Sequence, residues 1–183
     1  MINWIQSKIQ PKINKPNQLR ILINLVRFAP YRLTQGLSMT WAPHVTVATI
    51  VERDNPFLMV YEEADGKKVY NQPAGHLDPN ETLQAAAIRE TLEETGWTVK
   101  LTGAVGVNLY TAPSNGITYF RTTFIAEAVS HDAERALDTG IIEAVWLTYD
   151  ELLARKDELR SPMTLQIIDE YRAGRRFPLG VVG

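Results

Sequence analysis

The chain has 183 residues, of which 45% are apolar and 22% are charged, and its formal net charge is −2. These values are ordinary for one folded domain with a buried core, and the small net charge does not favour general nucleic-acid binding. The sequence has no cysteine, which excludes disulfides, thiolate catalysis and cysteine-based zinc sites. This composition is typical of a reducing compartment, so we expect a cytoplasmic protein.

Residues 1–40 are predicted to form a leader separate from the domain in residues 41–183. The leader carries Lys and Arg but no Asp or Glu, and residues 18–28 have the pattern of a short, basic amphipathic helix. Their apolar run is shorter than the roughly 20 residues that span a bilayer. Two interpretations are open. The segment is either a helix that binds a membrane surface, or it has no membrane role and is a packed or loosely attached leader or sequence upstream of a true start at Met39. We favour the second and expect no membrane partner unless the leader binds one.

Runs of apolar and β-branched residues predict three strands before a central helix, at residues 44–51, 57–61 and 69–72. The first run indicates a strand with both faces at least partly covered. Turn-forming residues separate the three runs. The third strand leads through Pro73 into a glycine loop at Gly75.

The central helix is predicted from its end signals. Asp78, Pro79 and Glu81 match an N-cap, a first-turn proline and a third-position glutamate. Asn80 is a competing cap. We expect the helix to end at Gly96, because glycine readily adopts the left-handed backbone that closes helices.

Three glutamates of this helix, Glu90, Glu93 and Glu94, fall on one face. At roughly 100° per residue, their spacing confines them to an arc of roughly 100°. Like charges this close repel unless a cation lies among them. The same arc contains Leu83, Ala86 and Ala87. The opposite side carries a predicted core stripe of Ala85, Ile88 and Leu92.

The glutamate face has two interpretations. It is either a site for a hard cation, which prefers carboxylate oxygens, or a solvated acidic face with an arginine at its edge. The spacing alone favours the solvated face. The residues around it decide between the two, as described below.

The remainder of the domain is predicted as strands followed by helices. Strands are expected at residues 99–101, 103–110, 118–129 and 143–147. The turn-forming residues 112–116 are predicted to form a loop that borders the substrate. Residues 131–139 are predicted to form a mobile polar loop.

Two helices are predicted at the C-terminal end. Thr148 and Glu151 form a capping box for the first. Pro162 opens the second, in which apolar residues recur at helical spacing. Strands interrupted by one helix and followed by others indicate an α/β domain with a mixed sheet between helices.

The segment from Gly75 to Trp97 matches the pattern G-x5-E-x7-R-E-U-x-E-E-x-G-U, where U is a bulky apolar residue. Its fixed positions are Gly75, Glu81, Arg89, Glu90, Glu93, Glu94 and Gly96, and only Thr91 departs, at a U position. This pattern resembles the signature of the Nudix hydrolases. The resemblance implies the Nudix α/β/α sandwich. It also implies an enzyme that uses Mg²⁺, or Mn²⁺ as an alternative, to hydrolyse phosphoanhydride bonds.

Four further blocks resemble one phosphatase branch of that family: WAPHVTVATIV, NQPAGHL, LRSPM and YRAGRRFPL. This resemblance implies hydrolysis of nucleoside tri- and diphosphates, hydroxymethylpyrimidine diphosphate and thiamine diphosphate by a monomer. One alternative is a diphosphatase for ADP-ribose or another nucleoside-diphosphate compound, since Pro113 lies close to a marker proline of that branch. The other is a non-catalytic Nudix-like module that binds a nucleotide, which the intact carboxylates disfavour.

The resemblance also implies roles for the residues of the motif. The metal ligands would be Glu90, Glu94, Glu93 and the Gly75 carbonyl, with Arg89 orienting Glu81 or Glu93. Glu94 is the expected general base, and Glu90 is the alternative. A further acidic ligand outside the motif is expected at Glu127, with Glu143 as the alternative.

Three other residues are expected to contact the substrate: His76, Arg121 and Trp41. His76 either approaches phosphate or only shapes the loop after Gly75. The planar guanidinium of Arg121 matches phosphate oxygens, and a surface position is the alternative. Trp41 is the tryptophan for which base stacking, rather than packing, is expected.

Overall fold

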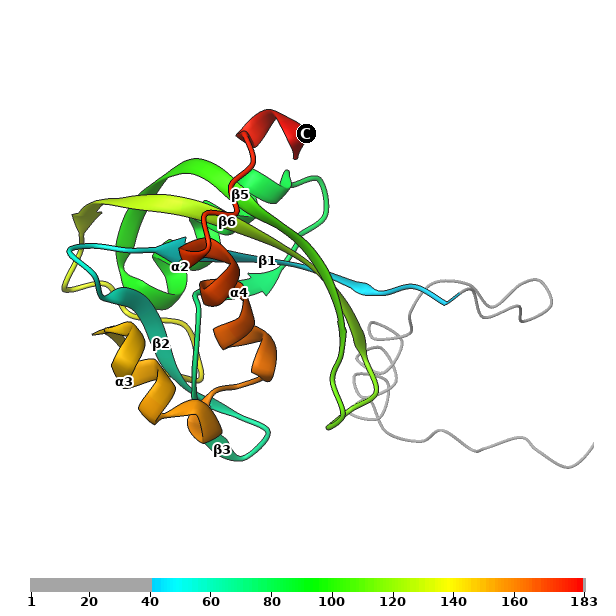
Figure 1. Ribbon diagram of the computed structural model, residues 1–183, viewed down its shortest axis with the longest axis horizontal. Coiled ribbons are helices and arrows are strands. Elements are labelled where there is room, and N and C mark those ends of the chain that lie inside the picture. The colour runs from blue at the N-terminus through cyan, green and yellow to red at the C-terminus, as the bar shows by residue number, and fades with distance from the viewer. Residues whose placement is uncertain (1–40, 183) are drawn as a thin grey trace, which may run out of the picture. The chain divides into compact units, whose positions relative to one another are not determined.

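The structure, a computed structural model, describes residues 41–182 and contains two β-sheets and their helices (Figure 1). The strands are β1 (His44–Val51), β2 (Phe57–Ala64), β3 (Lys67–Asn71), β4 (Ala74–His76), β5 (Trp97–Thr111), β6 (Thr118–His131) and β7 (Ile141–Leu147). The helices are α2 (Leu83–Thr95), α3 (Tyr149–Ala154) and α4 (Pro162–Arg172), with 3-10 turns η1 (Lys156–Glu158) and η2 (Leu179–Val181). The predicted leader and its helix at residues 18–28 lie outside the described residues.

The first sheet has the strand order β4-β1-β6-β5. Its strands β1 and β6 run parallel, whereas β4 and β5 are antiparallel to their neighbours, so this is the mixed sheet that the sequence predicts. A second sheet, entirely antiparallel, has the order β3-β2-β7. The α/β class is therefore confirmed. Residues 74–76, predicted as part of a glycine loop, form the short strand β4 instead.

Two predicted strands, at residues 99–101 and 103–110, form one long strand in the structure. The register of β5 against β6 shifts between Leu101 and Gly103 and again between Ala104 and Gly106. Such bulges let an antiparallel strand bend and continue, so Thr102 interrupts the alternation without ending the strand. Figure 1 shows β5 and β6 running side by side as a long, bent pair.

Helix α2 starts later than the sequence predicts. Its N-cap is Thr82, whose hydroxyl accepts a hydrogen bond from the Ala85 amide at 3.1 Å. The predicted cap, Asp78, instead begins a turn closed by the bond from the Glu81 amide to the Asp78 carbonyl at 3.2 Å. Asn80 adopts a left-handed backbone with φ of 67°, which breaks a right-handed helix at that residue. The predicted end is confirmed, because Gly96 caps the helix with φ of 70°.

The predicted core stripe of α2 is wrong. Ala85 is exposed and Ile88 is 36% exposed, whereas Ala86 and Ala87 are buried in a core cluster. The buried face also contains Thr91, Thr95, Glu90 and Glu94. Small side chains let the helix approach the sheet closely, and the Thr91 and Thr49 hydroxyls share a hydrogen bond of 2.8 Å. The core face and part of the glutamate face are therefore the same side of the helix.

Alternate residues of β1 point to opposite faces of the sheet and enter different cores. Val47 packs in the cluster that contains Ala86 and Ala87 of α2, whereas Ile50 packs with Ile167 of α4. Helices therefore cover both faces of the first sheet, as in a sandwich.

The C-terminal helices follow the predicted signals. The capping box of Thr148 and Glu151 is present at α3, and α4 begins at Pro162 after Ser161. Among the residues at helical spacing, Ile168 and Tyr171 are buried. None of the helices within residues 41–182 is long and apolar enough to cross a membrane.

Candidate active site

Arg89 lies among the acidic residues of the motif. Its Nε and Nη2 donate to the two carboxylate oxygens of Glu81 at 2.9 and 2.8 Å, and its Nη1 donates to Glu90 at 2.7 Å and to Glu93 at 2.9 Å. The bond to Glu81 raises the pKa of Arg89, and the same bond lowers the pKa of Glu81. Arg89 thus contacts Glu90 as well as the two glutamates it was expected to orient, and supplies the cation that these like charges require.

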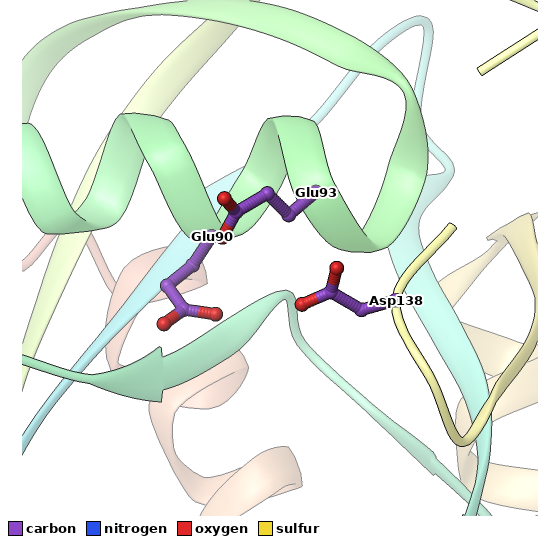
Figure 2. Close-up of side chains that lie close together, drawn as sticks. All are labelled: Glu90, Glu93 and Asp138. Carbon is purple, nitrogen blue, oxygen red and sulfur yellow. The ribbon is translucent and has the colours of Figure 1, made fainter. Parts of the chain in front are cut away.

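A cluster of three carboxylates forms beside Arg89. One oxygen from each of Glu90, Glu93 and Asp138 lies within 4.8 Å of the other two. Figure 2 shows Glu90 and Glu93 extending from the helix and Asp138 facing them from another segment. The Asp138 amide donates to the Glu93 carbonyl at 3.1 Å, which ties this segment to α2. The Glu90–Glu93–Asp138 cluster offers only oxygen ligands, the type that Mg²⁺ and Ca²⁺ prefer.

Gly75 lies directly against the Glu90 carboxylate. A Cβ added to Gly75 would come within 2.1 Å of the Glu90 Cδ atom, so no side chain fits there while Glu90 keeps its position. Pairing of Gly75 with Val47 in the β1–β4 ladder fixes the backbone at this point. The first glycine of the motif is therefore required for a close approach between β4 and α2.

Glu94 is buried and lines a cavity. Its Oε2 accepts a hydrogen bond from the Ala74 amide at 2.8 Å. Burial raises the pKa of Glu94 to about 8, and the nearby negative charges of Glu62 and Glu90 act in the same direction. Burial also raises the pKa of Glu90. A buried carboxyl with a raised pKa is typical of a group that exchanges protons near neutral pH.

The cavity has a volume of about 610 Å³, within the size range of small-molecule sites. Its walls come from both sheets and from the loop between β5 and β6. The first sheet contributes Thr46, Tyr110, Tyr119 and Arg121, the second contributes Glu62 and Asn71, and the loop contributes residues 112–115. The expectation that this loop borders the substrate agrees with its place in the wall.

His76 also lines the cavity and lies against a second histidine. The His44 Nδ1 and His76 Nε2 atoms are 3.3 Å apart, and both rings have edge-on or tilted contacts with Tyr119. Burial lowers the pKa of His76, and the charges of His44 and Arg160 lower it further. A neutral imidazole is therefore favoured at this position.

Arg121 is almost fully buried, at 7% exposure, so the surface alternative is wrong. Its Nη2 donates to the Gln72 side chain at 3.3 Å. Burial lowers the pKa of Arg121 to about 10, and the charge of Glu94 opposes this shift.

The structure does not bring Trp41, Glu127 or Glu143 to the cluster or to the cavity wall. Trp41 is 69% exposed. Glu127 is exposed and pairs with Lys100 across the β5–β6 ladder. At roughly 3.3 Å per residue, Glu127 lies about 20 Å along β6 from Arg121. Glu143 is exposed on β7 opposite Tyr61. These placements do not support the roles expected for the three residues.

Sequence reasoning missed three residues of the site: Asp138, Glu62 and Arg160. Asp138 lies in a stretch predicted as a mobile polar loop, and nothing in its spacing relates it to the helix. Glu62 follows the predicted end of the second strand, which continues to Ala64 in the structure. Arg160 lies within the LRSPM block, so the resemblance marked its neighbourhood but gave it no role. Its Nη1 lies 2.6 Å from the Glu62 Oε2 atom.

Comparisons with known proteins agree on one family. The family model described as the NUDIX domain matches residues 42–166. The chain is similar to the phosphatase NudJ of Escherichia coli strain K12, with 37% identity over 141 residues, which cover 77% of this chain and 91% of that protein. It is also similar to the solved structure of a NUDIX hydrolase from Nitrosomonas europaea, with 43% identity and a TM-score of 0.76 over 78% of this chain and 97% of that chain.

A more distant likeness extends the fold comparison. The NUDIX domain of Shewanella oneidensis NrtR, solved in complex with ADP ribose, has a TM-score of 0.60 and 15% identity over 84% of this chain and 97% of that chain. At this identity the likeness concerns the fold alone.

Proposed function

This chain belongs to the Nudix hydrolase family, and we propose that it is a Mg²⁺-dependent hydrolase of nucleoside tri- and diphosphates and of thiamine-pathway diphosphates. It is a hydrolase similar to the phosphatase NudJ. The observation that carries the proposal is the division of acidic groups on α2. The Glu90–Glu93–Asp138 cluster offers oxygen ligands, while the buried Glu94 lines the adjacent cavity.

The residues present fit a divalent cation. The cluster presents only carboxylate oxygens, and the absence of a side chain at Gly75 leaves room for the Glu90 carboxylate against β4. Glu90, Glu93 and Asp138 would hold the ion, with Mn²⁺ as an alternative to Mg²⁺. When bound, the ion would neutralise charge on phosphate oxygens and activate water. Arg89 orients Glu90 and Glu93 through the hydrogen bonds described above.

Glu94 is the proposed general base. It is held by the Ala74 amide at the cavity wall, and its raised pKa makes its carboxylate a better proton acceptor than an exposed glutamate. The alternative, in which Glu94 is also a metal ligand, predicts that its removal weakens metal binding. Arg121 and His76 are the proposed substrate-binding residues, because both line the same cavity as Glu94.

One substrate panel tests the proposal. Phosphate release would be measured with Mg²⁺ from GTP, GDP, hydroxymethylpyrimidine diphosphate and thiamine diphosphate, together with AMP formation from ADP-ribose. We expect phosphate release that requires Mg²⁺ and is lost in Glu94→Gln but retained in Glu134→Gln, an exposed glutamate outside the site. Binding of these compounds without any turnover would favour the non-catalytic alternative.

Activity on ADP-ribose is the second candidate function. The observation that favours it is the position of Pro113 in the cavity wall. Turnover confined to ADP-ribose would overturn the phosphatase proposal and leave the Nudix family unchanged.

We also propose that the protein is a cytoplasmic monomer, on the basis of its cysteine-free composition and modest charge. Light scattering of the purified full-length chain and fractionation of expressing cells would test these two points. A stable dimer, or recovery with membranes, would contradict them.

A further inference from the structure

The first sheet brings two of the three histidines of the chain into contact. His44 belongs to β1 and His76 to β4. The ladder between these strands pairs Thr46 with His76. His44 is two residues from Thr46, so its side chain leaves the same face of the sheet. The two histidines are therefore diagonal neighbours on one face of two paired strands.

The two rings face each other with accessible nitrogens. His44 Nδ1 and His76 Nε2 are 3.3 Å apart, and both residues are exposed. Tyr119 of β6 packs against both rings in an edge-on or tilted contact. The three side chains come from three strands that are hydrogen-bonded in one sheet, so their backbones are positioned before any ligand binds.

This distance between nitrogens matches that of two ligands around one tetrahedral ion. Zn²⁺ binds histidine nitrogens at about 2.0–2.1 Å, which places two such nitrogens roughly 3.3–3.4 Å apart. In a hydrogen-bonded pair of neutral imidazoles, one facing nitrogen carries a hydrogen and the other has a lone pair. If that hydrogen moves to the outer nitrogen of the same ring, both facing nitrogens have lone pairs. An ion could then bind without the net loss of a proton.

The histidine pair is separate from the Glu90–Glu93–Asp138 cluster. Gly75 lies against the Glu90 carboxylate, and His76 is the next residue of the strand, so its side chain leaves the opposite face. Ligand chemistry also distinguishes the two groups. Carboxylate oxygens suit Mg²⁺, whereas imidazole nitrogens suit Zn²⁺, Cu²⁺ and Ni²⁺.

We propose that His44 and His76 bind a transition-metal cation of the Zn²⁺ class beside the cavity. Within residues 41–182 no further histidine or carboxylate joins the pair, so water or oxygens of a bound anion would fill the remaining coordination positions. Because His76 lines the cavity, the ion would lie next to the place proposed for the substrate. This inference goes beyond the proposed function, since binding of the ion does not require hydrolase activity.

Calorimetric titration of the untagged 183-residue protein with Zn²⁺, at saturating Mg²⁺, tests the proposal. We expect one Zn²⁺ per chain in wild type. Binding should be at least about tenfold weaker in His44→Gln and in His76→Gln, since loss of even a group that supports a metal ligand costs about 10- to 100-fold. The matched control is His131→Gln, which should bind like wild type. His131 is exposed, stacks on Trp97 and lies at the other end of β6 from Tyr119.

A further variant and a spectroscopic measurement locate the ion. Asp138→Asn removes a carboxylate of the other cluster and should leave Zn²⁺ affinity unchanged. In NMR spectra, Zn²⁺ should shift the imidazole signals of His44 and His76 but not those of His131. Thermal unfolding would verify that each variant is folded.

Three results would overturn the proposal: no Zn²⁺ binding by wild type, wild-type affinity in His44→Gln, or binding that is lost in Asp138→Asn and retained in His44→Gln. The last result would assign the ion to the carboxylate cluster. Absence of Mg²⁺-dependent turnover, with Zn²⁺ binding by the histidine pair intact, would contradict the proposed function and support this site.

Discussion

Helix α2 carries three glutamates within about one turn, yet the surroundings of Glu90 and Glu93 differ from those of Glu94. Glu93 is partly exposed and bonds to Arg89, as does Glu90, and both face Asp138 in the Glu90–Glu93–Asp138 cluster. Glu94 is buried at the cavity, is held by a backbone amide and has its pKa raised to about 8. Carboxylates gathered around an arginine suit a divalent cation, whereas a carboxyl that lies away from the arginine and resists ionisation suits proton transfer. Neighbouring residues of one helix thus acquire different chemistry from their contacts rather than from their type.

The largest effect should come from replacing Glu94, the buried carboxyl at the cavity. Glu94→Gln should reduce kcat by about 10²- to 10⁴-fold, the contribution typical of one acid–base group. Glutamine keeps the shape, and its oxygen can accept the Ala74 amide hydrogen, so the midpoint of thermal unfolding should remain close to that of wild type. Phosphate-release rates and thermal unfolding measure the two quantities. Near-normal turnover at saturating Mg²⁺ would contradict the role given to Glu94.

The next effect concerns the Glu90–Glu93–Asp138 cluster. Gly75→Ala should displace the Glu90 carboxylate, because the added Cβ would lie 2.1 Å from the Glu90 Cδ atom. We expect activity and Mg²⁺ affinity to fall by about 10- to 100-fold, as when the support of a metal ligand is lost.

Gly180→Ala is the matched control for Gly75→Ala, since a Cβ at Gly180 meets nothing within 4 Å. Activity and metal binding should be measured for both variants under the same conditions. If Gly75→Ala retains wild-type metal affinity, Glu90 is not held in place by the close approach of β4.

The second glycine of the motif should affect stability rather than chemistry. Gly96 has φ of 70°, and a Cβ there would lie 2.7 Å from the Asp132 carbonyl oxygen. Gly96→Ala should lower the free energy of unfolding by about 1–2 kcal/mol, since an L-residue is strained in this conformation and the contact must relax. Urea unfolding measures this change. A large loss of kcat in the folded variant, with stability unchanged, would reverse the roles assigned to the two glycines.

The smallest effect is expected outside the comparison, in residues 1–40. A chain that starts at Met39 should keep kcat/KM within about twofold of the value for the 183-residue chain, because the site residues that the structure describes all lie within residues 41–182. Cosedimentation of both chains with anionic vesicles tests the membrane-surface alternative. Vesicle binding that requires residues 1–40 would establish that alternative.

The sequence predicted those parts of the site that are close along the chain. Gly75, Arg89, Glu90, Glu93 and Glu94 lie within one motif, so helical spacing and the resemblance were enough to group them. The predicted helix start was wrong because Asp78 and Glu81, the residues expected to cap the helix, instead close a turn through a backbone hydrogen bond. The buried face was wrong because α2 packs through alanine and threonine, which a search for large apolar residues overlooks.

The parts that could not be predicted depend on contacts distant in sequence. Asp138 reaches α2 only through the segment between β6 and β7, and Glu62 meets Arg160 only because β2 and the segment before α4 converge at the cavity. Glu127 was favoured by resemblance alone, and the register of β5 against β6 places it opposite Lys100 instead. Strand register is set by packing across the sheet, and a single sequence does not reveal it.

Binding of Mg²⁺, measured by calorimetry beside phosphate release, tests most directly the claim that α2 separates metal binding from proton transfer. Wild type, Asp138→Asn and Glu94→Gln would be compared under the same conditions. We expect Asp138→Asn to weaken Mg²⁺ binding by about tenfold or more, and Glu94→Gln to bind within about threefold of wild type while losing turnover. Loss of Mg²⁺ binding in Glu94→Gln as complete as in Asp138→Asn, or unchanged binding in Asp138→Asn, would contradict the separation.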